Sequence, residues 1–436
     1  MTQPIPRPRA RRWLSAPMAI AVIGATMAIP AASVSAAEPT DMVLEWNTNA
    51  INAIANANTA DPPGLGQVPP LAPVHLAMVH GAIYDAVNSI DDTRQPYLVN
   101  INAPPGASRA AAVAQAAHDV LVGLVPLSLP QVKTSLDSLL GISLGKITPG
   151  ASRNAGVAVG AAAAAAMLAN RVGDGRANTS RTFPIGTTAG KWRPVPPLSN
   201  NVFSWIGDVR PFSVNSGSQF KVQPDPPLQS AQYTAEFNEV KALGAQVGST
   251  RNAAQEALSN FIVVNPFSPV NTAFREIAAA KGLSTSQQAR LFAMTSLSSA
   301  DALIGCWNNK NRYLSWRPQT AIQLAATDGN PNTVANPTWV SKFPTPGYPD
   351  NPSGYNCFAA SMMTAGRAFF GTDNVAFELR NSASTRSYTQ FSGYVKDAIE
   401  GRILIGFHFR HADVNGAWLG KTVANWVTAH EFKLLD

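Results

Sequence analysis

Charged residues are scarce in this chain, and cysteines are scarcer still. Asp, Glu, Lys and Arg make up only 14% of the 436 residues and hydrophobic residues 45%, which excludes an intrinsically disordered protein. No group of Cys, His, Asp or Glu has the spacing of a zinc site, and the chain lacks a phosphate-binding loop and a Gly-x-Ser-x-Gly nucleophile elbow. The common catalytic motifs are therefore absent, although the chain is long enough for one large or two modest domains.

An export signal is predicted over residues 1–37. Four arginines between positions 7 and 12 precede an apolar run over 16–30, and small residues at 34–36 suit cleavage. The pair Arg11-Arg12 suits twin-arginine export, with the general secretory route as the alternative. We expect a secreted or periplasmic protein.

The basic excess of the chain lies mostly in this segment. Residues 1–37 hold four of the 33 Lys and Arg residues and no acidic one, so 29 basic and 26 acidic residues remain. No basic stripe with interleaved aromatic residues is left, which argues against a nucleic-acid partner. No later apolar run reaches the roughly 18 residues that span a bilayer, so we expect no membrane span.

The chain has two cysteines, Cys306 and Cys357. An oxidising compartment makes them a candidate disulfide, and two buried free thiols are the alternative.

Helical periodicity dominates after the signal, so we predict a mainly α fold built from helical bundles. Few stretches alternate as strands do. The clearest helical ranges are 41–57, 73–90, 107–124, 151–171, 231–246, 251–264, 284–311, 356–370, 393–408 and 415–430.

Two long segments without periodicity are rich in Pro and Gly. The first, 174–230, also carries buried-type aromatic residues, so we interpret it as a connection wrapped over the helices. The second covers 327–354. We predict an N-terminal helical region over 38–173, the connection, and a C-terminal helical region over 231–436.

The most informative residues are polar and lie in three short segments. Lys310 and Arg317 are seven apart, so on one helix they would share a face, and Pro318 places Arg317 at or near the helix end. Ser353-Gly354 follows a Pro-rich loop and precedes an apolar helical run, which predicts a helix N-terminus able to bind an oxyanion. A surface patch and a plain helix cap are the alternatives.

The third segment contains Arg402 and His408. They are six residues apart, so they can meet one ligand only if they contact it from different sides or if the helix ends or bends near Gly406. Elsewhere, His75 and His80 lie on a helical stretch without an acidic partner and are interpreted as structural, and His118 and His430 belong to no group.

Together the three segments resemble the superfamily of vanadium-dependent haloperoxidases and type 2 phosphatidic acid phosphatases. Its pattern is Lys-x6-Arg-Pro, then Pro-Ser-Gly-His, then Ser-Arg-x5-His. Here 310–318 match the first part in full, 352–354 match three of the four residues of the second, and Arg402 with His408 match the third, Gly401 replacing its serine. Three further stretches, 75–88, 205–220 and 408–413, resemble a secreted bacterial and plant haloperoxidase-like branch of this superfamily.

The resemblance implies a helical fold of that type with an oxyanion held by Lys310, Arg317, Ser353, Gly354 and Arg402 and bonded to His408. It implies vanadate as cofactor, with His408 as its covalent partner, and hydrogen peroxide, a halide and an organic acceptor as small-molecule substrates. A phosphate in place of vanadate, and an acid phosphatase with His408 as nucleophile, are the alternatives.

Besides Gly401, two positions depart from the family pattern. Tyr355 replaces the acid-base histidine, and a phenol with a reference pKa near 10 is a poor proton shuttle at neutral pH. We considered His411, three residues after His408, as its substitute. Asp413 follows His408 by five residues, where the wider superfamily has an acid at four. A weakened enzyme that mainly binds an oxyanion is thus a third hypothesis. The sequence indicates neither the halide nor an oligomeric state.

Overall fold

The structure is a computed structural model that describes residues 38–57, 70–126, 128–196 and 201–435. The predicted export segment, 1–37, lies outside the described residues. All described residues belong to one compact unit, Ala37–Asp436.

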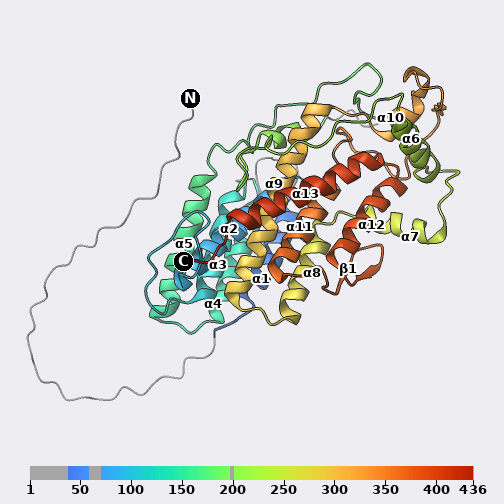
Figure 1. Cartoon of the computed structure of the whole chain (residues 1–436). Coiled ribbons are helices and arrows are strands. Elements are labelled where there is room, and N and C mark those ends of the chain that lie inside the picture. The colour runs from blue at the N-terminus through green and yellow to red at the C-terminus, as the bar shows by residue number, and fades with distance from the viewer. Residues whose placement is uncertain (1–37, 58–69, 127, 197–200, 436) are drawn as a thin grey trace, which may run out of the picture. The chain divides into compact units, whose positions relative to one another are not determined.

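Helices make up nearly all of the regular structure (Figure 1), which confirms the mainly α fold. Each of the ten predicted ranges contains a helix. The helices missed are α4, α8 and α10, and the hairpin β1–β2 was also missed. The elements are α1 Met42–Asn56, α2 Ala72–Asp91, α3 Arg109–Leu124, α4 Pro130–Gly145, α5 Ala151–Asn170, η1 Ser204–Asp208, α6 Ala231–Leu243, α7 Ala253–Ile262, α8 Phe267–Ala280, α9 Thr285–Tyr313, α10 Pro318–Gln323, η2 Ala325–Thr327, α11 Gly354–Phe370, β1 Phe377–Arg380, β2 Thr385–Tyr388, α12 Phe391–Leu404 and α13 Arg410–His430.

The core forms around α2 and α9, two helices that pack on each other and are buried on nearly all sides. A helix buried all round has no polar face, which explains why both have apolar or small residues at most positions. In turn, α11 packs between α9 and α13 (Figure 1). A second, smaller core cluster forms from α6, α10 and the chain around Trp339 and Phe409.

Two glycines bring α13 very close to α11. A Cβ atom at Gly416 would lie 2.5 Å from the Ser353 carbonyl oxygen, and one at Gly420 would lie 2.4 Å from that of Cys357. Only glycine permits such a backbone approach. The crossing therefore fixes the N-terminus of α11 against the start of α13.

The described parts of the segment 174–230, residues 174–196 and 201–230, hold few regular elements, and some of their residues bond to the helices. Trp192 and Trp205 are buried in it. The buried Asp301 of α9 accepts the backbone N–H groups of Phe212, Ser213 and Val214 at 2.6, 2.8 and 3.0 Å. These bonds anchor the connection to the core, because the carboxylate satisfies backbone donors that are removed from water.

Among the described helices, none is both long and apolar enough to cross a membrane.

Candidate functional site

Lys310 lies in the last turn of α9 and is fully buried. Its Nζ donates to the carbonyl oxygens of Pro349 and Asp350 at 2.6 and 2.8 Å. Burial, with the charge of Arg317 as a further cause, lowers the pKa of Lys310 to about 8. The lysine therefore ties the end of α9 to the loop that precedes α11.

Arg317 does not share a helix with Lys310, which corrects the prediction of a common face. The helix α9 ends where Leu314 adopts a left-handed backbone conformation, and Arg317 is extended as the N-cap of α10, before Pro318. Its Nε donates to the Tyr348 carbonyl at 2.8 Å and its Nη1 to the Phe407 carbonyl at 2.9 Å. The buried Nη2 has no hydrogen-bond partner among the described residues.

Ser353 and Gly354 begin α11, as predicted. A Cβ atom at Gly354 would lie 2.9 Å from the ring of Trp307, so this position excludes a side chain. The first backbone N–H groups of the helix have no partner within it and favour an anion.

Arg402 and His408 are separated by the end of α12 at Leu404, and Gly406 has a φ of 78°. The helix predicted over 393–408 thus ends early, and the turn at Gly406 lets both side chains enter one site, which is one of the two arrangements that the sequence allowed. The Arg402 guanidinium lies between the rings of Tyr355 and Phe407, 5.0 and 4.8 Å from their centroids. Its buried Nε, like Arg317 Nη2, has no hydrogen-bond partner within the described chain.

Gly401 replaces the serine of the family pattern because the space is occupied. A Cβ atom there would lie 2.5 Å from the side chain of Ile262 in α7. A serine at this position would clash unless α7 moved.

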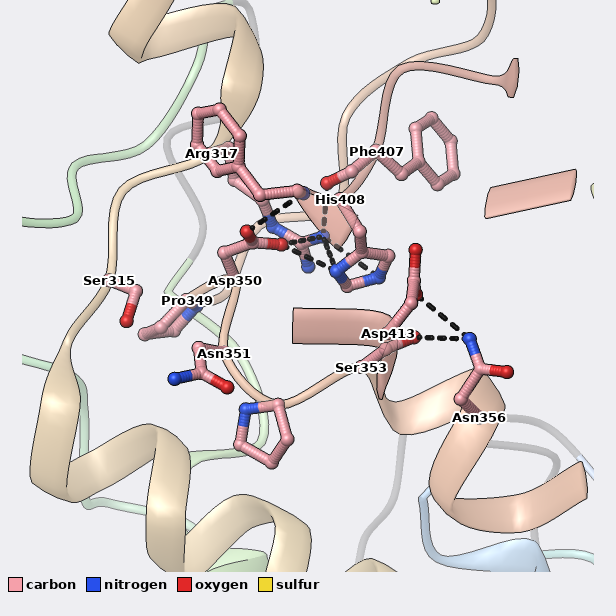
Figure 2. A network of polar contacts seen from close by, with 12 residues as sticks. Ser315, Arg317, Pro349, Asp350, Asn351, Ser353, Asn356, Phe407, His408 and Asp413 are labelled. Carbon is pink, nitrogen blue, oxygen red and sulfur yellow. Dashed lines mark hydrogen bonds and ion pairs between the residues drawn. The ribbon is translucent and has the colours of Figure 1, made fainter. Parts of the chain in front are cut away.

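His408 is oriented by Asp350, a residue that the sequence analysis missed. His408 Nδ1 lies 2.5 Å from Asp350 Oδ1, and the Phe409 N–H donates to Oδ2 at 3.2 Å (Figure 2). Arg317 Nη1 lies 3.2 Å from His408 Nε2. Because the carboxylate accepts from Nδ1–H, the neutral ring carries its lone pair on Nε2.

The charges around His408 favour this neutral form. Burial and then Arg317, Arg402 and Lys310 hold the pKa of His408 well below its usual value. Burial raises the pKa of Asp350 to about 6, although Arg317, His411 and Lys310 oppose the shift. At pH 7 and above, Asp350 is ionised and His408 is neutral, so Nε2 is available as a nucleophile or ligand.

Asp413 is not the acid that orients His408. Its Oδ1 accepts from Asn356 Nδ2 at 2.8 Å (Figure 2), and its Oδ2 has no partner among the described residues. Burial raises its pKa well above the usual range, whereas Ser353, Arg402 and Asn356 oppose the shift. Asp413 therefore supports the start of α11 rather than His408.

His411 does not substitute for the missing acid-base group. Its Nδ1 lies 2.5 Å from Glu236 Oε2 and its Nε2 lies 3.0 Å from Asp225 Oδ1, so neither nitrogen is free. Burial alone would lower its pKa, but the hydrogen bonds to the two carboxylates raise the pKa to about 10. The ring is a fixed cation at neutral pH, and a fixed cation cannot shuttle protons.

The hydroxyl group of Tyr355 is poorly suited to proton transfer. Its hydroxyl group lies 3.0 Å from that of Tyr394. Burial raises the pKa of Tyr355 to about 12, with Tyr394 and Arg402 opposing. The hydroxyl stays protonated at any pH where the protein would work.

The predicted disulfide is wrong in the structure: Cys306 and Cys357 are buried free thiols. The packing of α9 on α11 does bring the two thiols within hydrogen-bonding reach of each other. Cys306 Sγ also contacts the Pro352 carbonyl at 3.5 Å. They pack as small apolar groups beneath the site, which was the alternative interpretation.

The other histidines lie in structural settings. His75 and His80 are fully buried in α2, where His80 Nε2 lies 2.8 Å from Asn47 and its ring stacks on Phe292. His118 bridges two aspartates on the surface, and His430 stacks on Trp426. Within the described ranges, no group of three or more His, Cys, Asp or Glu side chains could hold a metal ion.

Three buried cations surround His408, and their burial costs free energy. Lys310 and Arg317 are fully buried and Arg402 is 6% exposed, while the carboxylate that accompanies them, Asp350, is shared with His408. Burying cations without matching anions costs several kcal/mol for each ion. The unpartnered Arg317 Nη2 and Arg402 Nε, and the glycine at 354, fit a tetrahedral oxyanion bound next to His408 Nε2.

The affinity of this site for inorganic phosphate should fall as the pH rises through about 8. Lys310 is charged below the pKa of about 8 and neutral above it, so one of three cations is lost on the alkaline side. Isothermal titration calorimetry between pH 6.5 and 9.5 would measure the change. Lys310→Arg keeps the charge and should flatten the dependence, apart from the ionisation of phosphate itself. Equal slopes in both proteins would contradict the assignment.

Comparison with known proteins shows which family model and which folds this chain resembles. Residues 290–436, which contain all six predicted oxyanion-binding residues, match the family model of the VCPO second helical-bundle domain. A bacterial vanadium-dependent iodoperoxidase has a TM-score of 0.73 at 21% identity, covering 91% of this chain and 96% of its own. The holo form of a bacterial vanadium-dependent chloroperoxidase has a TM-score of 0.70 at 14% identity, covering 90% and 97%.

The apo form of a bacterial chloroperoxidase has a TM-score of 0.66 at 15% identity, covering 87% of this chain and 96% of its own. No curated protein matches. Identities this low establish the shared fold and leave the activity open. The chain therefore shares the fold of bacterial vanadium-dependent haloperoxidases, and its residues 290–436 match the family model of the VCPO second helical-bundle domain.

Proposed function

We propose that this protein is a vanadate-dependent haloperoxidase-like enzyme that uses hydrogen peroxide to oxidise a halide. The observation that carries the proposal is the cluster of three buried cations around His408, whose Nδ1 is held by Asp350. The likeness to vanadium iodo- and chloroperoxidases over about nine-tenths of the chain supports it.

The residues present fit vanadate. Lys310, Arg317 and Arg402 would neutralise its oxygens, and Ser353 and the N–H groups at the start of α11 would donate to them. His408 Nε2 would be its protein ligand. When bound, vanadate would supply the Lewis acidity that activates hydrogen peroxide toward a halide. The chain itself contributes a fixed imidazole lone pair, fixed positive charge and the exclusion of water.

The test is bromide- and peroxide-dependent bromination by the purified protein, with and without added vanadate. We expect activity only with vanadate, and a loss of at least 10³-fold in His408→Ala, because no other side chain offers a lone pair at this place. His430→Ala, which changes an exposed histidine, is the matched control and should retain activity. Vanadate-independent hydrolysis of a phosphate ester without bromination would replace this proposal by the next one.

Phosphomonoester hydrolysis is the second candidate function, favoured by the same lone pair on His408 Nε2. His408 would attack phosphorus, and the cations would stabilise the equatorial oxygens. Because Tyr355 cannot protonate a leaving group, only esters with an acidic leaving group, such as 4-nitrophenyl phosphate, should react. Tight oxyanion binding with neither activity would identify a binding protein.

A further inference from the structure

A pocket opens beside the oxyanion site and is lined largely by rings. Its walls include Trp307, Tyr348, Tyr355, Phe358 and Phe407, and its volume is about 210 Å³. Apolar cavities of roughly 150 Å³ take up benzene. The pocket, which we call the aromatic pocket, therefore has room for one substituted six-membered ring and is too small for a fused ring system.

Arg402 belongs to both the aromatic pocket and the oxyanion site. It lines the pocket, and its guanidinium is held between the rings of Tyr355 and Phe407. Gly354, the first residue of α11, also lines the pocket. A molecule in the pocket would thus lie directly against the groups that surround His408.

Tyr355 contributes a ring to this wall and no proton donor. Its hydroxyl is engaged with that of the fully buried Tyr394 of α12. A histidine here would replace this ring by a more polar one, and its unpaired nitrogen would cost free energy. The replacement of the family histidine therefore makes the pocket more apolar at the point nearest the oxyanion.

We propose that the aromatic pocket binds a monocyclic phenol as the organic acceptor, and that Tyr355 is one of its binding residues. Aromatic walls suit the ring, and Arg402 suits an electron-rich face or a phenolic oxygen. The role as acceptor rests on the proposed haloperoxidase activity. Hypohalous acid from that activity would form a carbon–halogen bond as the ring C–H bond breaks, the proton leaving with hydroxide as water.

Binding is tested without vanadate, peroxide or halide, so it succeeds or fails independently of the enzyme activity. Phenol binding would be measured by ligand-observed NMR titration. Val263→Trp places a large ring at the rim and should weaken binding at least tenfold, because Val263 lines the pocket. Val247→Trp, at an exposed position outside the pocket, is the matched control and should bind as wild type does. Equal binding by both variants would overturn the proposal.

A second test measures which ring size the pocket prefers. It compares two ligands on the same variant, so a loss of protein stability affects both dissociation constants alike. Wild type should prefer phenol to 1-naphthol, and Phe358→Ala should shift the ratio of dissociation constants at least tenfold toward 1-naphthol by enlarging the pocket. Phe237→Ala removes a buried ring from the second core cluster and should leave the ratio unchanged. An unchanged ratio in Phe358→Ala would mean that phenol binds elsewhere. Bromination without phenol binding would leave the activity standing and remove the acceptor site.

Discussion

Asp350→Asn should lower turnover by about 10²- to 10⁴-fold while leaving oxyanion binding intact. The carboxylate of Asp350 accepts from His408 Nδ1–H, which leaves the lone pair on Nε2. An amide at this position can donate to Nδ1 instead, which moves the ring proton to Nε2 and removes the lone pair. In serine proteases the corresponding change of tautomer costs about 10⁴-fold.

The expected separation of turnover from binding distinguishes this role from a structural one. Asn carries no negative charge, so the three cations gain net positive charge and phosphate should bind at least as tightly as in wild type. Nitrogen NMR of the His408 ring would report the tautomer directly. Asp328→Asn is the control, at a buried aspartate whose carboxylate accepts from Asn330 and Thr333 of its own loop. Unchanged turnover in Asp350→Asn would show that this carboxylate does not set the tautomer.

The sequence predicted the helices well where apolar periodicity is strong and less well where local signals conflict. In α4, only Val132, Leu136 and Ser143 are buried, so the helix carries a weak apolar stripe. In α8, Pro269 follows Pro266 in the first turn, where proline is tolerated but resembles a loop signal. Packing against neighbouring elements stabilises these two helices, and the local sequence does not reveal such contacts.

The sequence indicated which residues form the candidate site but not which residues bond to them. The helix start at Ser353 followed from the Pro-rich loop before it, whereas α12 ends at Leu404 and not at the predicted 408. The partner of His408 did not follow from the sequence, because Asp350 lies in an aperiodic loop 58 residues away along the chain. Spacing from His408 suggested His411 and already counted against Asp413, yet α13 begins at Arg410 and Phe409 is extended. His408 therefore lies outside that helix, and helical spacing from it to either residue has no meaning.

Tyr355→His is expected to raise the turnover of bromination by about 10²-fold or more, and it is the change that best separates the roles of this position. General acid-base catalysis is typically worth about 10²- to 10⁴-fold, and a phenol whose pKa is raised to about 12 supplies none of it near neutral pH. An imidazole on the first turn of α11 would accept a proton from hydrogen peroxide. The same change should weaken phenol binding, because it replaces a ring of the pocket wall with a polar one.

The gain in turnover of Tyr355→His should depend on pH. A buried imidazole next to the charged Arg402 would have a pKa below its usual 6.5, because burial and a neighbouring cation both disfavour the charged form. The gain in Tyr355→His should therefore be full at neutral pH and disappear as the pH falls through that lowered pKa. Tyr355→Phe removes only a hydroxyl that meets Tyr394, so its turnover should match wild type. If Tyr355→Phe loses activity instead, the hydroxyl group of Tyr355 takes part in catalysis. Tyr355 would then be a catalytic residue and not only a lining residue of the pocket.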